Sequence, residues 1–334
     1  MFDKKRYGLG LNLLLNNVCN KKCSYCYEKN DGSEVMTIKI ADKVIEKLRN
    51  SDYWIKSVMF FGGEPTISLP LMKHLYEKNR EDVSFRVTTN GYFLEKYDER
   101  DYSFMKGFEN ITVSIEGTEE AFKTLRGGDN LNFLESQMIA LSNNNYSVTA
   151  NISVNGLLYS NIDEFVSRIE RLIENNIAIH FYYLKSNDYF SSLEDYTSFI
   201  LEIRDRNKRI YDMIILNDNN DDYSFEYLCT LENELTVNPL GKFITCAWDK
   251  KALGDIDTPI ESIVNSWASE VAKNHKKMWS GCENCEVNMG KCSVSCPAFI
   301  NECMKNDNIE LLESLCDRQR VNEYLRRKEF GSDK

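Results

Sequence analysis

The eleven cysteines of this 334-residue chain fall into two groups that lie far apart in the sequence. Cys19, Cys23 and Cys26 form the first group, and no other cysteine follows before Cys229. The second group occupies the C-terminal third and consists of Cys229, Cys246, Cys282, Cys285, Cys292, Cys296, Cys303 and Cys316. Cysteines that only fill a core would be scattered, whereas short fixed spacings in a reducing compartment indicate metal binding or catalysis. The sequence therefore predicts two separate metal-binding regions.

The first group places three thiolates on one tight loop, with three and then two residues between neighbouring cysteines. A structural zinc ion takes a fourth ligand, and no further Cys or His follows nearby. Three cysteines suit a [4Fe–4S] cluster whose fourth iron is open to an exogenous ligand, in contrast to the usual site with four cysteines. A zinc site or a chance cysteine loop is the alternative.

Six apolar runs, each followed by a connecting stretch that is helical in most cases, are the elements that must position this loop. The expected strands are Leu9–Leu15, Ser57–Phe61, Phe85–Thr89, Ile111–Ile115, Val148–Val154 and Ile177–Tyr183, and the expected helices are Ile38–Leu48, Leu69–Lys78, Leu131–Ser142, Ile162–Ile173 and Leu193–Met213. Strand–helix units in series predict an α/β fold with a parallel sheet and right-handed crossovers, either an open doubly wound sheet or a barrel. Ligands bind in both folds at the C-terminal ends of the strands, where the cysteine loop begins.

Further motifs follow at successive strand ends, and together with the cysteine loop they resemble the radical S-adenosylmethionine superfamily. They are Phe60–Pro65 (FFGGEP), Thr88–Gly91 (TTNG) and Val113–Gly117 (VSIEG). The resemblance implies that Gly62, Gly63, Glu64 and Pro65 hold the methionine amino group of the cofactor, and that Asn90, Ser114 and Glu116 line its ribose and methionine portion. A typical relative has Asp where this chain has Glu116. Tyr25 is expected near the adenine, with an ordinary strand-end aromatic as the alternative.

The resemblance implies a partial (β/α)6 barrel in which Cys19, Cys23 and Cys26 hold a catalytic [4Fe–4S] cluster. S-adenosyl-L-methionine chelated on the open iron would be cleaved reductively into methionine and a 5′-deoxyadenosyl radical, which abstracts a hydrogen atom from the substrate. The cofactor carries this chemistry, and the protein supplies orientation and excludes water. A flavodoxin- or ferredoxin-type reductant is the expected electron donor.

The C-terminal cysteines resemble the SPASM extension of peptide- and protein-modifying radical enzymes. Eleven residues separate Cys229 from Gly241 and four separate Gly241 from Cys246, while the later spacings are two, six and three, with six standing where the family has five. The resemblance implies two auxiliary [4Fe–4S] clusters, the outer one held by Cys282, Cys285, Cys292 and Cys316 and the inner one by Cys229, Cys246 and Cys296. Cys303 does not fit the pattern and is either a buried thiol or a substitute ligand. A zinc ribbon over Cys282–Cys296 is the alternative.

A domain boundary is expected between residues 213 and 214, close to the polar run Asn217–Asp222. This gives a radical barrel over 1–213 and an auxiliary-cluster domain over 214–334, opened by a hairpin with strands Glu234–Asn238 and Lys242–Trp248. The histidines His74, His180 and His275 share no metal-like spacing and are expected to be structural. Asp249 near Cys246 is a candidate base, although a solvated hairpin position is the simpler account.

Composition limits the class of partner. The net charge of −11 argues against nucleic-acid binding, because proteins that bind nucleic acid collect Lys and Arg on one face. No apolar run is long enough to span a bilayer and no signal peptide precedes the first strand, so a cytoplasmic protein is expected.

We expect an oxidoreductase that matures a ribosomally synthesised peptide by hydrogen abstraction followed by thioether or carbon–carbon cross-linking. The 18 residues before Cys19 leave no room for a leader-binding domain, so either a separate leader-recognition protein serves this role or the core of the precursor peptide is recognised directly. One alternative is formylglycine formation as in anaerobic sulfatase maturases, although Ala247 stands where those enzymes have Asp. The alternative from another class is a non-catalytic zinc or iron–sulfur protein.

Overall fold

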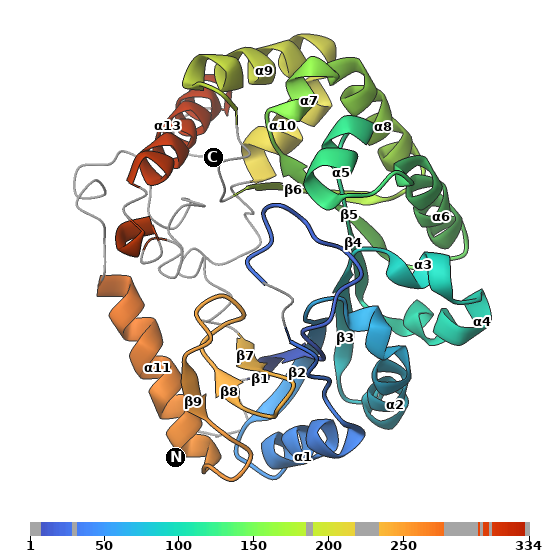
Figure 1. Ribbon diagram of the computed structural model, residues 1–334, viewed down its shortest axis with the longest axis vertical. Helices are drawn as coiled ribbons and strands as arrows, with labels where there is room; N and C mark the ends of the chain where they lie inside the picture. The colour runs from blue at the N-terminus through green and yellow to red at the C-terminus, as the bar shows by residue number, and fades with distance from the viewer. Residues whose placement is uncertain are drawn as a thin grey trace.

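The computed structural model describes residues 8–28, 32–184, 190–217, 234–276, 300, 303–306 and 309–330 (Figure 1). Cys229, Cys282, Cys285, Cys292 and Cys296 lie outside these described residues. The ligand sets expected for the two auxiliary clusters therefore remain predictions.

All six predicted strands are confirmed, and they form the parallel part of one curved sheet. Their bounds are β1 Gly8–Leu14, β2 Trp54–Phe61, β3 Ser84–Thr89, β4 Asn110–Ile115, β5 Val148–Val154 and β6 Ala178–Tyr183. The strand order β6-β5-β4-β3-β2-β1 follows the chain in sequence, as expected for consecutive strand–helix units. The helices lie outside the curve of this sheet (Figure 1). The architecture is that of a partial barrel.

The strands alternate between a face that packs under the helices and a face that lines the barrel lumen. Phe60, Val87, Val113 and Ile152 are fully buried under the helical layer. Their neighbours on the other face are more polar and include Thr88, Ser114, Asn151 and His180, which line a cavity. The period-two alternation of strand side chains therefore separates the hydrophobic core from a polar lumen.

The connecting helices include four of the five predicted ones, with small shifts at their ends. The helices between β1 and β6 are α1 Ile38–Arg49, α2 Leu69–Asn79, α3 Tyr92–Lys96, α4 Glu99–Tyr102, α5 Glu119–Arg126, α6 Leu131–Asn143, α7 Leu157–Ser160 and α8 Ile162–Glu174. The sequence analysis did not anticipate α5, which has a Thr118 N-cap accepting from the Ala121 amide and ends at Gly127 with a left-handed φ of 64°. This helix places Arg126, its last residue, beside the lumen.

The single helix predicted over Leu193–Met213 is wrong, because the structure has two helices there. These are α9 Leu193–Arg206 and α10 Lys208–Asn217, separated by Asn207 in an extended conformation. The Asn207 Oδ1 atom accepts a hydrogen bond from the Ile210 amide at 3.0 Å and so caps the second helix. Side-chain capping by Asn competes with helix continuation, which is why the chain turns at this residue.

The C-terminal strands continue the same sheet beyond β1. β7 Glu234–Val237 pairs parallel with β1, and β8 Phe243–Ile244 pairs antiparallel with β7, which confirms the predicted hairpin. β9 Ala252–Gly254 ends the sheet. α11 Ile260–Lys276 contacts β9 and α13 Ile309–Phe330 contacts α9 and α10, so these two helices lie toward opposite ends of the sheet (Figure 1). α10 spans the expected boundary at 213/214, and the two-domain division stays a prediction.

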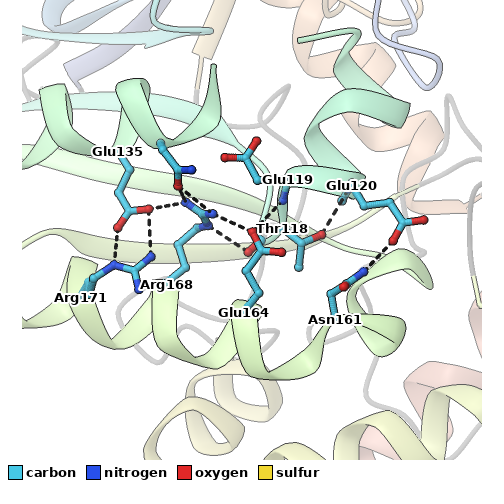
Figure 2. A network of polar contacts seen from close by, with 11 residues as sticks. Thr118, Glu119, Glu120, Glu135, Asn161, Glu164, Arg168 and Arg171 are labelled. Carbon is cyan, nitrogen blue, oxygen red and sulfur yellow. Dashed lines mark hydrogen bonds and ion pairs between the residues drawn. The ribbon is translucent and has the colours of Figure 1, made fainter. Parts of the chain in front are cut away.

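A buried polar network ties the outer helices to the loop after β4 (Figure 2). Arg168 of α8 is only 1% exposed and donates to the Gly117 carbonyl at 3.1 Å. Its guanidinium also pairs with Glu135 of α6 and with Glu164, the latter at 2.8 Å. Arg171 adds a second ion pair to Glu135 at 2.7 Å. The network satisfies charges that would be costly to bury alone.

Candidate functional site

A cavity of about 560 Å³ opens at the C-terminal ends of the barrel strands. It is lined by most of the residues that the motifs single out, namely Cys19, Cys23, Tyr25, Cys26, Gly62, Gly63, Glu64, Asn90 and Ser114. Two predicted site residues, Pro65 and Glu116, are buried behind the lining and do not belong to it. The structure thus brings the motifs of four strand ends around one space, whose volume is typical of a small-molecule site.

The three cysteines of the first loop all face this cavity. The Ser24 amide donates to the Leu125 carbonyl at 2.9 Å and the Cys26 amide to the Cys23 carbonyl at 3.2 Å, so the loop is fixed on itself and on α5. Burial raises the pKa of the Cys19 thiol to about 11, although the Lys21 amide opposes this shift. Burial also raises the pKa values of Cys23 and Cys26. Without metal the thiols are therefore protonated at neutral pH, and metal binding would release these protons.

Three thiols that face one cavity fit an iron–sulfur cluster. Within the residues that the structure describes, no three Cys, His, Asp or Glu side chains gather as ligands of one metal ion. In a cluster each cysteine binds a different iron, so thiols spread around one cavity are the appropriate arrangement.

The two glycines at the end of β2 allow the backbone to approach the cysteine loop. A Cβ atom on Gly62 would lie 2.4 Å from the Asn16 carbonyl oxygen, and one on Gly63 would lie 2.3 Å from the Val18 carbonyl oxygen. Gly62 also has a φ of 137°, which L side chains rarely adopt. The Gly63 amide donates to Asn16 at 2.9 Å, so the Gly-Gly pair is needed for this close pairing of two loops.

Glu64 joins the ends of β2 and β3 from a buried position. Its Oε1 atom accepts from the Thr66 hydroxyl at 2.6 Å and from the Thr89 hydroxyl at 2.7 Å. Its Oε2 atom accepts from the Asn90 amide at 2.7 Å. Burial raises the pKa of the Glu64 carboxyl, and these hydrogen bonds oppose the shift. The side chain therefore orders the cavity wall, while its backbone faces the cysteine loop through the Glu64 amide, which donates to the Val18 carbonyl at 2.8 Å.

Asn90 connects the third strand end to the cysteine loop. Its Nδ2 atom donates to the Cys19 sulfur at 3.5 Å and to Asn20 Oδ1 at 2.8 Å. Its Oδ1 atom accepts from the Tyr92 amide at 3.0 Å, which fixes the orientation of the side-chain amide. Asn90 is consequently placed to orient the first cysteine.

A row of polar side chains crosses three neighbouring strands at one level of the lumen. Ser114 pairs in register with Asn151 of β5, and Asn151 with His180 of β6. His180 Nδ1 lies 2.6 Å from Asn151 Oδ1, and because an amide oxygen can only accept, Nδ1 carries the proton and Nε2 is left as an acceptor. His180 was expected to be structural, but it lines the cavity.

The sequence analysis also missed Arg126 and Tyr182, which line the same cavity. The alternation along the predicted strand Ile177–Tyr183 places His180 and Tyr182 on one face, and this was the available signal for both. For Arg126 there was no local signal, since its position depends on where α5 ends.

The C-terminal hairpin packs directly against the cysteine loop. The rings of Tyr27 and Trp248 stack with centroids 4.9 Å apart, and Lys250 Nζ pairs with Glu28 at 2.6 Å. This contact carries Cys246 toward the loop, whereas Asp249 accepts from the Thr245 hydroxyl at 2.9 Å within the hairpin. Cys246 of the second cysteine group therefore lies in the hairpin that packs on the first group's loop.

Two further cysteines lie near this hairpin in a small apolar cluster. Cys303 is buried with Leu312 and Leu315, and Cys316 and Trp248 pack against them. The burial agrees with the expectation of a buried thiol for Cys303, and it also places Cys303 near the predicted cluster ligand Cys316.

Within the described residues, no helix combines the length and the apolar character that crossing a bilayer requires.

Comparison with known proteins finds a family model that matches the barrel. The family model described as the radical SAM superfamily matches residues 13–172. Over 92% of this chain, 24% of aligned residues are identical to the radical SAM cyclopropyl synthase TigE of Paramaledivibacter caminithermalis, of which 71% is covered. A probable GTP 3′,8-cyclase of Methanococcus maripaludis is 28% identical over 34% of this chain and 38% of its own length.

Solved structures share the fold over most of the chain. The sulfatase maturase anSMEcpe with bound AdoMet superposes with a TM-score of 0.67 at 19% identity, covering 94% of this chain and 99% of its own. SuiB of Streptococcus suis, in complex with the precursor peptide SuiA, superposes with a TM-score of 0.62 at 14% identity, covering 89% of this chain and 73% of its own. At sequence identities below 25%, the structural similarity establishes the fold of this chain and not its function.

Proposed function

We propose, from the match of residues 13–172 to the radical SAM superfamily, that the chain is a cytoplasmic enzyme that modifies a ribosomally synthesised peptide. The family implies S-adenosyl-L-methionine and a [4Fe–4S] cluster as cofactors. The observation that carries the proposal is the convergence of Cys19, Cys23 and Cys26 with the Gly62–Glu64, Asn90 and Ser114 positions around one cavity.

The residues of the cavity divide the work in the proposed reaction. Cys19, Cys23 and Cys26 would hold the cluster, and the backbone and side chains at Gly63, Asn90 and Ser114 would orient the cofactor. When bound, the cofactor supplies a carbon radical that removes a hydrogen atom from the substrate. Phe181, Tyr183 and Leu184 add an apolar wall to this space.

A peptide substrate is the proposed substrate class. Two structures of similar fold contain peptides, namely SuiB with the precursor peptide SuiA and anSMEcpe with the Cp18Cys peptide. The cavity is open to the lumen, so a flexible chain has access to it. We propose cross-linking through a thioether or a carbon–carbon bond, with a flavodoxin- or ferredoxin-type electron donor and, where a leader is read, a separate leader-recognition protein.

We further propose that residues 214–334 form a SPASM auxiliary-cluster region. The stack of Trp248 on Tyr27 supports this, because it places the hairpin of Cys246 beside the cysteine loop. An auxiliary cluster there would be near enough to accept the electron that remains after a bond closes. Reconstituted protein is expected to contain about three clusters, roughly twelve iron atoms per chain. A Cys246→Ala variant is expected to lose iron and peptide modification while retaining 5′-deoxyadenosine formation.

Removal of the first cysteine group tests the radical assignment. Changing Cys19, Cys23 and Cys26 together to Ala should abolish reductive cleavage of S-adenosylmethionine, because the cluster would have no thiolate ligands. 5′-Deoxyadenosine is quantified by liquid chromatography after dithionite reduction. A Cys303→Ala variant serves as a control for loss of a buried thiol. Undiminished 5′-deoxyadenosine in the triple variant would refute the assignment.

Co-expression tests the peptide assignment. The chain is produced with each short reading frame beside its gene, and the peptides are examined by mass spectrometry. A cross-link removes two hydrogen atoms per bond, whereas formylglycine formation changes a Cys or Ser side chain into an aldehyde. A peptide whose mass changes only with the intact cysteine loop supports the proposal. Cleavage of the cofactor with no modified peptide in any pairing contradicts it.

A further inference from the structure

Four side chains from four separate elements form a closed ring of hydrogen bonds next to the cysteine loop. The Tyr25 hydroxyl donates to Glu116 Oε1 at 2.8 Å, and Arg126 Nε donates to the same oxygen at 2.8 Å. Arg126 Nη2 donates to the Tyr182 hydroxyl at 3.2 Å, and the Tyr182 hydroxyl donates to the Tyr25 hydroxyl at 3.0 Å. Each proton in this ring is used once, so all four contacts can exist together.

Protein donors occupy most of the acceptor positions of Glu116. Its Oε2 atom accepts from the Ser153 hydroxyl and from Asn155 Nδ2, the latter at 3.5 Å. Tyr25, Arg126 and Ser153 are thus its three close donors, because Asn155 Nδ2 also donates to Ser153 at 2.9 Å and 3.2 Å. The side chain is fully buried and does not line the cavity. A direct contact between Glu116 and the ribose or methionine of the cofactor, as the family resemblance implied, does not fit this geometry.

The charges in the ring compensate one another. Burial raises the pKa of the Glu116 carboxyl, and the Arg126 guanidinium opposes that shift. Burial works against the Arg126 charge, but the surrounding Tyr25, Tyr182 and Glu116 oxygens raise the pKa of Arg126 well above its usual range. Three close donors, one of them the Arg126 guanidinium, complement an ionised carboxylate, so Glu116 and Arg126 form an ion pair. Burial also raises the pKa of Tyr25, which keeps its hydroxyl a donor.

The ring attaches the cysteine loop to the barrel through Tyr25. Tyr25 lies between Cys23 and Cys26, and the centroid of its aromatic ring is 5.5 Å from the Arg126 guanidinium carbon. The neighbouring Ser24 amide bonds to the Leu125 carbonyl, which gives the loop a second anchor on the same helix end. A shorter Asp at position 116 would retreat by about one C–C bond, ~1.5 Å, and lose its reach to Tyr25.

We propose that Glu116 is a positioning residue that fixes the cysteine loop through Tyr25. The inference deepens the proposed function and rests on it, since the loop is the one that would hold the radical cluster. Glu116 determines where Cys23 and Cys26 stand when iron arrives, and Arg126 is held beside the cavity by the same carboxylate.

Hydrogen exchange on the full chain without cluster tests this role. Amide exchange of a peptide spanning residues 19–27 is followed by mass spectrometry in wild type, Tyr25→Phe, Glu116→Gln and the double variant. Both single variants should accelerate exchange at least threefold relative to peptides from β3 and β4, because the loop loses its side-chain anchor. The double variant should exchange no faster than the faster single variant, because both changes remove the same contact.

Two further variants keep the outcome interpretable. Tyr27→Phe removes a hydroxyl from a neighbouring tyrosine on the same loop whose ring stacks on Trp248, and it should exchange as wild type does. Glu116→Asp retains the charge beside Arg126, and it should accelerate loop exchange even if Glu116→Gln destabilises the whole barrel.

The proposal is overturned by wild-type loop exchange in Tyr25→Phe and Glu116→Asp, or by additive effects in the double variant. It is also overturned if Glu116→Gln weakens S-adenosylmethionine binding in the reconstituted protein while Tyr25→Phe does not, because a direct contact would then be at work. No peptide substrate enters the exchange measurement, so its result does not depend on whether the enzyme modifies a peptide.

Discussion

Arg126 and Arg168 are both buried arginines paired with buried glutamates, yet they lie on opposite faces of the sheet. Arg126, which is 5% exposed, faces the lumen and bonds to Glu116 and Tyr182 beside the cavity. Arg168, which is 1% exposed, lies in the helical layer and bonds to Glu135, Glu164 and the Gly117 carbonyl (Figure 2). Both arginines form buried ion pairs. Of the two, Arg126 also bonds to a side chain that lines the cavity, Tyr182.

This difference shows that a buried ion pair is not by itself a sign of a functional site. The Arg168 network connects α6 and α8 of the helical layer to the Gly117 carbonyl in the loop after β4. Its effect is to fix helices, and breaking it should lower stability. The Arg126 pair holds a tyrosine of the cysteine loop, and breaking it should change the cavity before it changes the fold.

The largest expected effect is on stability at Arg168. An Arg168→Met variant should lose about 3 kcal/mol in the free energy of unfolding, because Glu164 and the Gly117 carbonyl lose their buried donor. Glu135 keeps its contact with Arg171 at 2.7 Å, so the loss should not exceed the usual range for one broken pair. Urea denaturation followed by circular dichroism measures this change.

The Arg168→Met variant also tests whether the Arg168 network affects the cavity. At temperatures where it is folded, Arg168→Met should form 5′-deoxyadenosine at close to the wild-type rate per folded molecule. An Arg206→Met variant, which removes an exposed ion pair with Glu202 on α9, controls for the loss of an arginine from the helical layer. A severe loss of cofactor cleavage in folded Arg168→Met would show that the outer network acts on the cavity after all.

The second effect concerns activity at Arg126. A lysine at this position keeps the charge but has one nitrogen, so it cannot bond to Glu116 and Tyr182 in the directions that guanidinium Nε and Nη2 take. Arg126→Lys should lower 5′-deoxyadenosine formation about tenfold, the equivalent of one charge-assisted hydrogen bond, with a smaller loss of stability than Arg168→Met. Equal losses of stability in the two variants would remove the distinction between the two arginines.

The sequence was sufficient to predict the strands and to locate the motifs at their C-terminal ends. Strands such as Ile111–Ile115 alternate apolar and polar residues, and parallel topology then places their C-terminal ends at one edge. The break at Asn207 was missed because neither Gly nor Pro marks it, and the Asn side chain ends the helix through a local hydrogen bond.

The ring around Glu116 could not be predicted in the same way. Its hydrogen bonds join residues that are 91 and 157 positions apart in the chain, as in Tyr25 to Glu116 and Tyr182 to Tyr25. A motif identifies a residue type at a strand end, but the partners of its side chain depend on tertiary packing. Sequence therefore located Glu116 at the site, whereas its bonds to Tyr25 and Arg126 are visible only in the folded structure.

The smallest expected effect concerns His180, a lumen residue without a charged partner among its described contacts. Water reaches its side chain through the open lumen, but the surrounding protein desolvates it and lowers its pKa below the usual 6.5. The unfolded chain then binds a proton at a higher pH than the folded chain does. Stability should therefore be complete above about pH 6.5 and should fall as the pH drops from there toward the folded pKa.

A His180→Gln variant should show a flatter dependence of stability on pH in this acidic window, because glutamine does not titrate. Urea midpoints at about pH 7.5 and about pH 5.5 measure the difference for wild type and variant. His74→Gln removes a histidine that pairs with Asp42 outside the lumen, and because it retains His180 it should keep the acid-side loss that His180 causes. If His180→Gln and wild type lose the same stability between these two pH values, then desolvation in the lumen does not control this imidazole. Arg126 would then be the remaining lumen residue of this comparison whose surroundings differ in their effect from those of Arg168 in the helical layer.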